Sequence, residues 1–314
     1  MAHLIKLADY ASRYEHDIQR YPSQFSRLKR ERWHRMKEDW SRAARISEMD
    51  KELEASNWFE EEQKSFFAAT VDRLKRLTIK KSSLEIEEEE EKDSLVNYYH
   101  GKSLDELKEL FYEELYQAQL HWASTSLLEE SELDSKYYYD QRLRYLLREL
   151  PDNYMVLYYP IVVVEKAPVE MEIILLSPTE IFTVSVLEGK PNSVFSPDTG
   201  RYWTEFVDEK RKRVINPLIS LNRMTRMVRD LLEPLQVSLP VQRVLLSPQS
   251  LIDYHSANVH TETVDKRNHQ MWLDKMKRQP SPIKKVQLEV AEKLLRQSFT
   301  TSSARYNQTE RNPE

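Results

Sequence analysis

The spacing of apolar residues divides the chain into a helical first part and a mixed second part. Over the first 135 residues apolar positions recur at three- and four-residue steps, as in amphipathic helices. We expect a first helix to end before Pro22 and a second to begin at Ser23, since proline interrupts a helix interior. Ser103 followed by Glu106 is a capping-box signature, so a third helix is predicted over 103–128.

Between these helices the pattern is weaker. An apolar stripe runs over 58–77, and the acidic run Glu87–Glu91 then interrupts it. Five like charges in a row are typical of a solvated helix end or loop, so no core is expected there. The polar stretch Leu128–Lys136 marks the predicted domain boundary.

Beyond this boundary short apolar runs alternate with turn residues. Leucines at 143, 146, 147 and 150 predict a helix that leads up to Pro151. Three strand-like runs follow at short separations, so an antiparallel meander is expected. These runs are Tyr154–Glu165, Val169–Leu176 and Ile181–Leu187.

The sequence from Glu188 onward predicts a loop, two helices and a strand. Glu188–Arg213 is polar and is interpreted as loop-rich, whereas Asn216-Pro217 opens a helix with one apolar face. Val241–Leu246 has the pattern of a short buried strand, and Ile283–Gln297 that of a helix. We therefore expect an α+β protein with a helical N-terminal region (1–135), a mixed domain (136–250), and a C-terminal helix with a flexible tail (251–314).

Composition excludes several classes of function. Cysteine is absent, which rules out disulfides, cysteine zinc sites and cysteine nucleophiles. Only three of the 314 residues are glycine, and neither glycine-rich nucleotide motif occurs. No apolar run is long enough for a membrane span or signal peptide, so we expect a cytoplasmic protein without membrane contact.

Charge is unevenly distributed along the chain. Residues 1–45 hold 11 Lys and Arg against 6 Asp and Glu, although the whole chain has a net charge of −5. The basic segment predicts a solvated helix face, and nucleic acid is one candidate partner for it. A protein partner or self-association through the helical N-terminal region is the other candidate.

The order of elements over 136–250 resembles the NERD (nuclease-related) domain, a relative of restriction-endonuclease-like PD-(D/E)xK nucleases. The residues that carry the resemblance are Leu150–Leu157, Glu172–Val184 across a Ser-Pro turn, Trp203, and Asn216-Pro217-Leu218. The resemblance implies an αβββαβ domain with a small central mixed sheet.

The resemblance also implies a site. Active relatives hold a divalent cation between an acidic residue that opens the middle strand and a Glu-x-Lys that ends the next strand. Oxygen ligands suit Mg²⁺, which neutralises the phosphate, and the lysine orients or activates water. The strand acid is matched by Glu172 and the upstream helix acid by Asp140, but the Glu-x-Lys falls on Ser185 and Leu187. Ser220 takes the place of the family's glutamine.

These replacements predict a degenerate site, because serine lacks a carboxylate's charge and leucine lacks a positive charge. Glu188-Gly189-Lys190 is a Glu-x-Lys displaced by three residues, and an odd shift turns side chains to the opposite strand face unless a bulge intervenes. The scattered histidines 100, 121, 255, 260 and 269 show no metal-ligand spacing.

Three hypotheses follow. The first is a catalytically degenerate nuclease-related protein that binds protein or nucleic acid and needs no cofactor. The second is a Mg²⁺-dependent nuclease that uses Glu172 as metal ligand with Asp140, Glu188 and Lys190. The third is a helical interaction or scaffold protein in which the β region is only structural.

Overall fold

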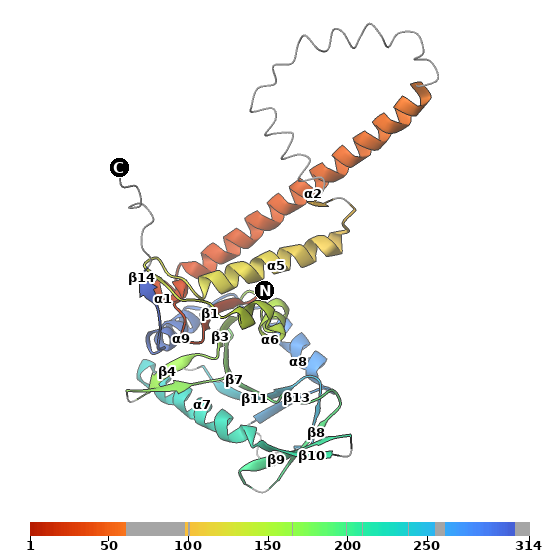
Figure 1. Cartoon of the computed structure of the whole chain (residues 1–314). Helices are drawn as coiled ribbons and strands as arrows, with labels where there is room; N and C mark the ends of the chain where they lie inside the picture. Colours follow the sequence, from red (N-terminus) through yellow and green to blue (C-terminus); the bar gives the residue numbers. More distant parts are fainter. Residues whose placement is uncertain are drawn as a thin grey trace, which may run out of the picture. The chain divides into compact units, whose positions relative to one another are not determined.

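A computed structural model describes residues 1–60, 98–99, 101–164, 166–198, 200–208, 210–237, 239–254 and 261–304. The chain divides into two compact units, one of Met1–Ser26 with Leu115–Glu314 and one of Arg27–Glu114 (Figure 1). The acidic run Glu87–Glu91 and most of the apolar stripe over 58–77 lie outside the described residues.

A six-stranded mixed sheet forms the centre of the first unit, with the order β1-β3-β6-β7-β11-β13. β3, β6 and β7 pair antiparallel, whereas β1 joins β3, and β11 joins β7 and β13, in parallel. Together with the helices this sheet confirms the α+β class. The strands are β1 (His3–Leu7), β3 (Met155–Tyr158), β6 (Ile173–Leu176), β7 (Ile181–Val186), β11 (Val241–Ser247) and β13 (Thr261–Asp265).

The first two predicted strands are each divided in the structure. Tyr159, with φ +49°, and Pro160 end β3, because a left-handed residue turns the chain and proline donates no ladder hydrogen bond. The chain then forms β4 (Ile161–Val164) and β5 (Ala167–Glu170), which pair with each other as a separate hairpin. The predicted antiparallel meander is therefore correct for β3, β6 and β7.

The N-terminus is a strand where a helix was predicted. All five residues of β1 are buried, including His3 and Lys6, and β1 pairs with β3. A short helix α1 (Arg13–His16) follows, and Pro22 lies in the first turn of α2 (Tyr21–Glu60) instead of ending a helix. Five residues are too few for periodicity to separate helix from strand, and the free edge of β3 decides between them.

Helices cover both faces of the six-stranded sheet. α6 (Gln141–Glu149) and α8 (His269–Lys277) bury Leu143, Leu147 and Trp272 against one face. α7 (Pro217–Leu232) lies on the opposite face, where the hydroxyls of Thr183 and Thr225 are 2.7 Å apart. The predicted helix over Ile283–Gln297 is α9 (Lys285–Arg296).

The segment Glu188–Arg213, predicted as loop-rich, contributes most of a second sheet. Its four strands have the order β10-β9-β8-β12. Trp203 and Glu205 point inward and are buried, while their neighbours in the sequence point outward. This alternation is the strand period, but the inward position of the charged Glu205 and the charged run Lys210–Arg213 that follows made it hard to recognise. The strands are β8 (Val194–Pro197), β9 (Tyr202–Val207), β10 (Lys210–Ile215) and β12 (Leu251–Ile252).

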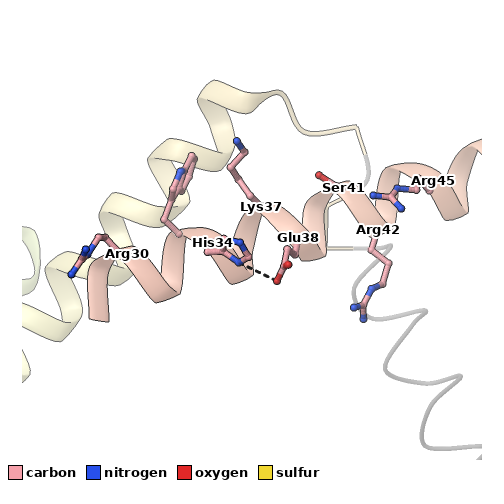
Figure 2. Close-up of a pocket in the computed structure, with 8 residues that line it drawn as sticks. Arg30, His34, Lys37, Glu38, Ser41, Arg42 and Arg45 are labelled. Atoms are coloured by element: carbon pink, nitrogen blue, oxygen red, sulfur yellow. Dashed lines mark ion pairs between the residues drawn. The ribbon is translucent and has the colours of Figure 1, made fainter. Parts of the chain in front are cut away.

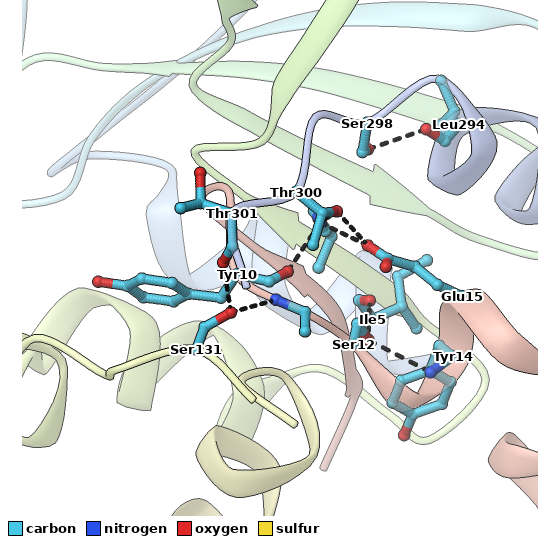
Figure 3. Close-up of polar contacts among 12 residues, drawn as sticks. Ile5, Tyr10, Ser12, Tyr14, Glu15, Ser131, Leu294, Ser298, Thr300 and Thr301 are labelled. Carbon is cyan, nitrogen blue, oxygen red and sulfur yellow. Dashed lines mark hydrogen bonds and ion pairs between the residues drawn. The ribbon is translucent and has the colours of Figure 1, made fainter. Parts of the chain in front are cut away.

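A buried ionic network ties the N-terminal residues to a segment near residue 300 (Figure 3). Lys6 Nζ is fully buried, forms an ion pair with Glu15, and donates to Tyr10 O and Thr300 Oγ1, each at 2.7 Å. Burial lowers the pKa of Lys6, and the Glu15 carboxylate opposes that shift. Ser131 Oγ donates to Thr301 O at 2.6 Å, next to the pairing of β2 (Glu129–Glu130) with β14 (Ser303–Ala304).

The second unit contains most of α2 and the beginning of α5 (Leu104–Trp122). The predicted capping box is present, since Ser103 N donates to Glu106 Oε2 at 2.7 Å and Glu106 N donates to Ser103 Oγ at 3.3 Å. Arg32 binds Glu114 with two hydrogen bonds of 2.6 and 2.8 Å. α5 ends six residues before the predicted limit of 128. Two short 3-10 helices in the first unit are Ser135–Tyr139 and Glu233–Leu235.

One face of α2 carries a shallow, basic hollow of about 670 Å³ (Figure 2). His34 and Glu38 form an exposed ion pair of 3.2 Å on this face. Pairs of this i,i+4 kind are typical of a solvated helix surface, in agreement with the sequence interpretation. Among the described ranges, no helix has the length and apolarity of a bilayer span. The side chains that line the hollow are Arg30, Trp33, His34, Lys37, Glu38, Ser41, Arg42 and Arg45.

Candidate functional site

Glu172 lies directly before β6, and its carboxylate reaches the end of β7. Oε1 accepts hydrogen bonds from the hydroxyls of Ser185 and Ser220, each at 2.8 Å. Oε2 accepts from the backbone N–H of Val186 at 3.0 Å. The structure thus brings together Glu172, Ser185 and Ser220, the residues that match the family's strand acid, the glutamate of Glu-x-Lys and the glutamine.

Local structure explains why these three residues meet. In the β6–β7 pair Ile173 is opposite Val184, so Glu172 falls beside Ser185 across the pair. The side chain of Asn216 caps α7 by accepting from Leu218 N at 3.0 Å. This cap fixes the first turn of α7, which carries Ser220 over the carboxylate.

A hollow of about 210 Å³ opens beside Glu172 and is bordered by Tyr159 and Arg223. Tyr159 N donates to the Glu172 carbonyl oxygen at 2.6 Å, and the Tyr159 hydroxyl accepts from Arg142 Nη1 at 2.8 Å. Burial raises the pKa of Tyr159, Arg142 opposes this, and the charges of Glu172 and Asp140 raise it further. The hydroxyl therefore stays protonated at neutral pH and serves as a hydrogen-bonding group.

Sequence reasoning did not single out Tyr159 or Arg142 for this site. The pair Tyr159-Pro160 carried a usable signal, since the residue before a proline is restricted in conformation and often lies in a turn. Nothing in the sequence pattern marked Arg142, because it is one of several arginines on the polar side of α6.

Leu187, at the lysine position of the family motif, is buried in a separate apolar cluster. It packs with Phe195, Trp203, Leu245 and Ile252 between the two sheets. The surroundings of this position are therefore apolar, and they suit leucine better than an ammonium group.

Asp140, at the helix-acid position, acts as a helix cap. Its Oδ1 accepts from the backbone N–H groups of Arg142 and Leu143 at 3.0 and 2.9 Å, and its Oδ2 accepts from the Tyr158 hydroxyl at 2.9 Å. These contacts lie at the start of α6, on the sheet face opposite α7. Burial raises the pKa of Tyr158, and the charge of Asp140 adds to the increase.

Glu188 and Lys190 follow the end of β7 and are exposed. Glu188 forms an ion pair with Arg142 of α6 and borders a cavity of about 640 Å³ that Tyr145 and Val186 also line. Lys190 N donates to Glu205 Oε1 at 3.2 Å. The structure does not join either side chain to the Glu172 carboxylate, whose hydrogen bonds come from two hydroxyls and one backbone amide.

The histidines are dispersed. His269 Nε2 lies 2.7 Å from the Tyr145 hydroxyl in the cavity beside α6, and burial lowers the pKa of His269. His121 Nε2 lies 3.1 Å from Arg13 Nη2. His100, His255 and His260 lie outside the described residues. Within the described ranges, no three His, Asp or Glu side chains are grouped closely enough to hold a metal ion.

The residues around Glu172 do not fit the Mg²⁺ site of active nucleases. Mg²⁺ prefers an octahedral set of oxygens with at least one or two carboxylates. Two carboxylates, Glu170 and Glu172, border the hollow. The hydroxyls of Ser185 and Ser220 donate their protons to Glu172, and being uncharged they add no negative charge that would hold a cation. The chemistry that this arrangement supports is charge-assisted hydrogen bonding to a carboxylate.

Comparison with known proteins places part of the chain in a family. Over 120 residues the chain is 32% identical to a protein named RNA 2',3'-cyclic phosphodiesterase from Geobacillus stearothermophilus. The matched segment is 38% of this chain. The chain spans about a third of that relative, 36% of its length. No solved structure matches the chain. Residues 135–248 match the family model described as the nuclease-related domain, NERD, and the chain therefore carries a nuclease-related domain over these residues.

Proposed function

We propose that this nuclease-related domain acts by binding and does not cleave nucleic acid with a metal ion. The observation that carries the proposal is the Glu172 carboxylate, both oxygens of which accept hydrogen bonds from Ser185, Val186 or Ser220. Charge-assisted hydrogen bonds of this kind stabilise a carboxylate without a cation. The site acid thereby becomes a structural group that links β6, β7 and α7.

The environment of Leu187 supports the same proposal. Metal-dependent hydrolysis needs a group that positions or activates water, and the family's lysine supplies it. An ammonium group at residue 187 would enter an apolar cluster, which carries a high desolvation cost. The apolar packing between the two sheets thus favours leucine over lysine at residue 187.

The order of elements supports descent from a restriction-endonuclease-like αβββαβ domain. α6, β3, β6, β7, α7 and β11 follow one another along the chain, and the strands pair in one sheet. The β4–β5 hairpin and the strands β8, β9 and β10 are then additions to that frame. In this proposal the ancestral frame is retained while its catalytic groups are replaced.

The competing hypothesis is a Mg²⁺-dependent nuclease built on Glu172, Asp140, Glu188 and Lys190. Against it stand the ion pair of Glu188 with Arg142 and the use of Asp140 as a helix cap. The name of the Geobacillus relative denotes phosphodiester chemistry, but the shared segment is only about a third of that protein. A cyclic phosphodiester is nevertheless a substrate to include in the test.

The deciding experiment incubates the full chain with plasmid, single-stranded DNA, RNA and a 2',3'-cyclic nucleotide, with Mg²⁺ or Mn²⁺. We expect no turnover above that of Glu172→Ala. Turnover that is lost in Glu172→Ala or Glu188→Gln and kept in Glu289→Gln, a matched control on α9, would overturn the proposal.

A further inference from the structure

We infer that the outer face of the β8–β9–β10 sheet is a binding platform for single-stranded nucleic acid. This face lies within the nuclease-related domain but away from the Glu172 site. The inference deepens the proposed function by naming a class of ligand, and the binding itself does not require that the domain lack cleavage activity.

The strand period determines which side chains form the platform. In β9 Trp203 and Glu205 point inward, so Tyr202, Thr204 and Phe206 point outward. In β10 Arg211 lies opposite Phe206, Arg213 opposite Thr204, and Ile215 opposite Tyr202, which places both arginines on the same outer face. Phe206 is 38% exposed and Ile215 67% exposed, so protein does not cover this face.

Cation and ring are already paired on this surface. The Arg213 guanidinium carbon lies 4.2 Å from the centre of the Tyr202 ring, and that of Arg211 lies 5.5 Å from the centre of the Phe206 ring. A planar guanidinium on a ring keeps its second flat side free, and bases stack on such sides as they do on aromatic rings. Each arginine–ring pair is therefore a preformed stacking position.

Glu205, the acidic residue within the described strands of the hairpin, does not lie on the outer face. Glu205 points inward, is nearly fully buried, and lies 4.0 Å from the ammonium group of Lys212. Asp208 lies in the turn between β9 and β10. The outward positions of β10 thus combine two guanidinium groups with apolar surface, a combination that complements a chain of phosphates and bases.

A structural reason for the charges of β10 also exists, because edge strands often carry lysine and arginine to prevent pairing with other molecules. That reason accounts for charge at any position of the strand. It does not account for the exposed Phe206 ring and the half-buried Tyr202 ring on the neighbouring strand, directly beside the arginines. Rings interleaved with cations favour unpaired bases, which stack with little dependence on sequence, over a duplex whose bases are already stacked.

The test is fluorescence anisotropy of a labelled single-stranded oligonucleotide with the full chain and without divalent cations. We expect Arg211→Ala/Arg213→Ala to weaken binding and to reduce the slope of log K against log salt by about 1.4, since each lost phosphate contact removes about 0.7. The slope is a readout that a merely structural role of the arginines would not change. Lys285→Ala/Arg296→Ala on α9 removes the same charge from exposed side chains and should leave the slope unchanged.

A second variant tests stacking separately from charge. Phe206→Leu keeps an apolar side chain but removes the ring, and we expect affinity to fall by about 5- to 150-fold, the range measured when a stacking ring is removed. Phe206→Tyr keeps the ring and should bind like the parent protein. Equal binding by Phe206→Leu and Phe206→Tyr, an unchanged salt slope, or tighter binding of a duplex would each overturn the inference.

The outcomes separate this inference from the proposed function. Platform-dependent binding together with Glu172-dependent cleavage would overturn only the proposed absence of catalysis. No binding and no cleavage would overturn only the platform.

Discussion

The Glu172 site and the outer face of the β8–β9–β10 sheet differ in how their charged groups are satisfied. Both oxygens of Glu172 are engaged by groups from β7 and α7, so this charge is satisfied within the protein. Arg211 and Arg213 lie on aromatic rings, and both residues are exposed. The first arrangement stabilises the fold, and the second is available to a partner.

An acidic residue at the position of a family's catalytic acid is therefore not sufficient evidence of a catalytic site. A carboxylate can be retained because removing it would leave buried donors without an acceptor, which is costly in any fold. Fold-level similarity therefore has to be tested at the level of the groups that surround each residue.

Restoring the family motif should give the largest effect. We expect Ser185→Glu/Leu187→Lys to lower the free energy of unfolding by about 3–5 kcal/mol, because it places one charge beside Glu172 and another in an apolar cluster. Urea unfolding measures the change. Leu187→Met, which conserves volume without charge, should cost less than about 1.5 kcal/mol. Metal-dependent cleavage by a stable double variant would contradict the contrast drawn between the two regions.

Removing the Glu172 carboxylate should be the next most damaging change. Glu172→Ala leaves two hydroxyls and the Val186 amide without their acceptor, and we expect a loss of about 2–3 kcal/mol in thermal or urea unfolding. Glu172→Gln keeps one acceptor oxygen and should lose less. A variant Glu172→Ala as stable as the parent protein would show that the carboxylate is kept for another reason.

Asp265 links the two sheets, and it should make the molecule sensitive to acid. It lies on β13 and accepts from Ile252 N of β12 at 3.0 Å and from Arg267 Nη2 at 2.6 Å. Burial alone would raise the pKa of Asp265, but the bonds from Arg267 and Ile252 lower it below the ordinary value of 3.8. The stability that this carboxylate contributes is thus complete above about pH 4 and is lost as the pH falls through the lowered pKa.

Asp265→Asn separates this effect from general acid denaturation. We expect the variant to lose about 1–3 kcal/mol at neutral pH, because the amide returns only one acceptor oxygen to the several N–H groups of Ile252 and Arg267 that donate to the two carboxylate oxygens. The difference from the parent protein should shrink as the pH falls below 4 in urea unfolding. A difference that stays constant between pH 7 and pH 3 would show that the carboxylate contributes no pH-dependent stability.

Neutralising the platform should have the smallest effect on stability. Arg211→Ala/Arg213→Ala removes exposed side chains, and we expect the free energy of unfolding to change by no more than about 0.5 kcal/mol. The same protein should show the changed salt dependence of oligonucleotide binding. A large loss of stability would mean that the arginine–ring pairs hold the hairpin together, and it would weaken the contrast with Glu172.

The sequence predicted the elements whose signals are local. The Ser103–Glu106 capping box, the Asn216 cap with Pro217, and the closely spaced strands β3, β6 and β7 follow from residues that are neighbours along the chain. The grouping of Glu172 with Ser185 is also a local matter, since it depends on the register of one hairpin.

Elements that depend on distant partners were not predictable in this way. β1 is a strand because β3, about 150 residues away, offers it an edge. β10 carries the charged run Lys210–Arg213 and β9 carries Glu205 at an inward position, so the polar average over the segment concealed both strands. The positive φ of Tyr159 and the ion pair of Arg142 with Glu188 likewise depend on the assembled sheet and α6.

The order of the six-stranded sheet has a consequence for dissecting this protein. Both edge strands, β1 and β13, lie outside residues 135–248, so a fragment cut at these limits would leave β3 and β11 with open backbone edges. It would also lack α8 and α9, which cover parts of the sheet. Exposed edges of this kind act as templates for aggregation. The segment that defines the family is therefore smaller than the unit that must be expressed, inherited or transplanted as a whole.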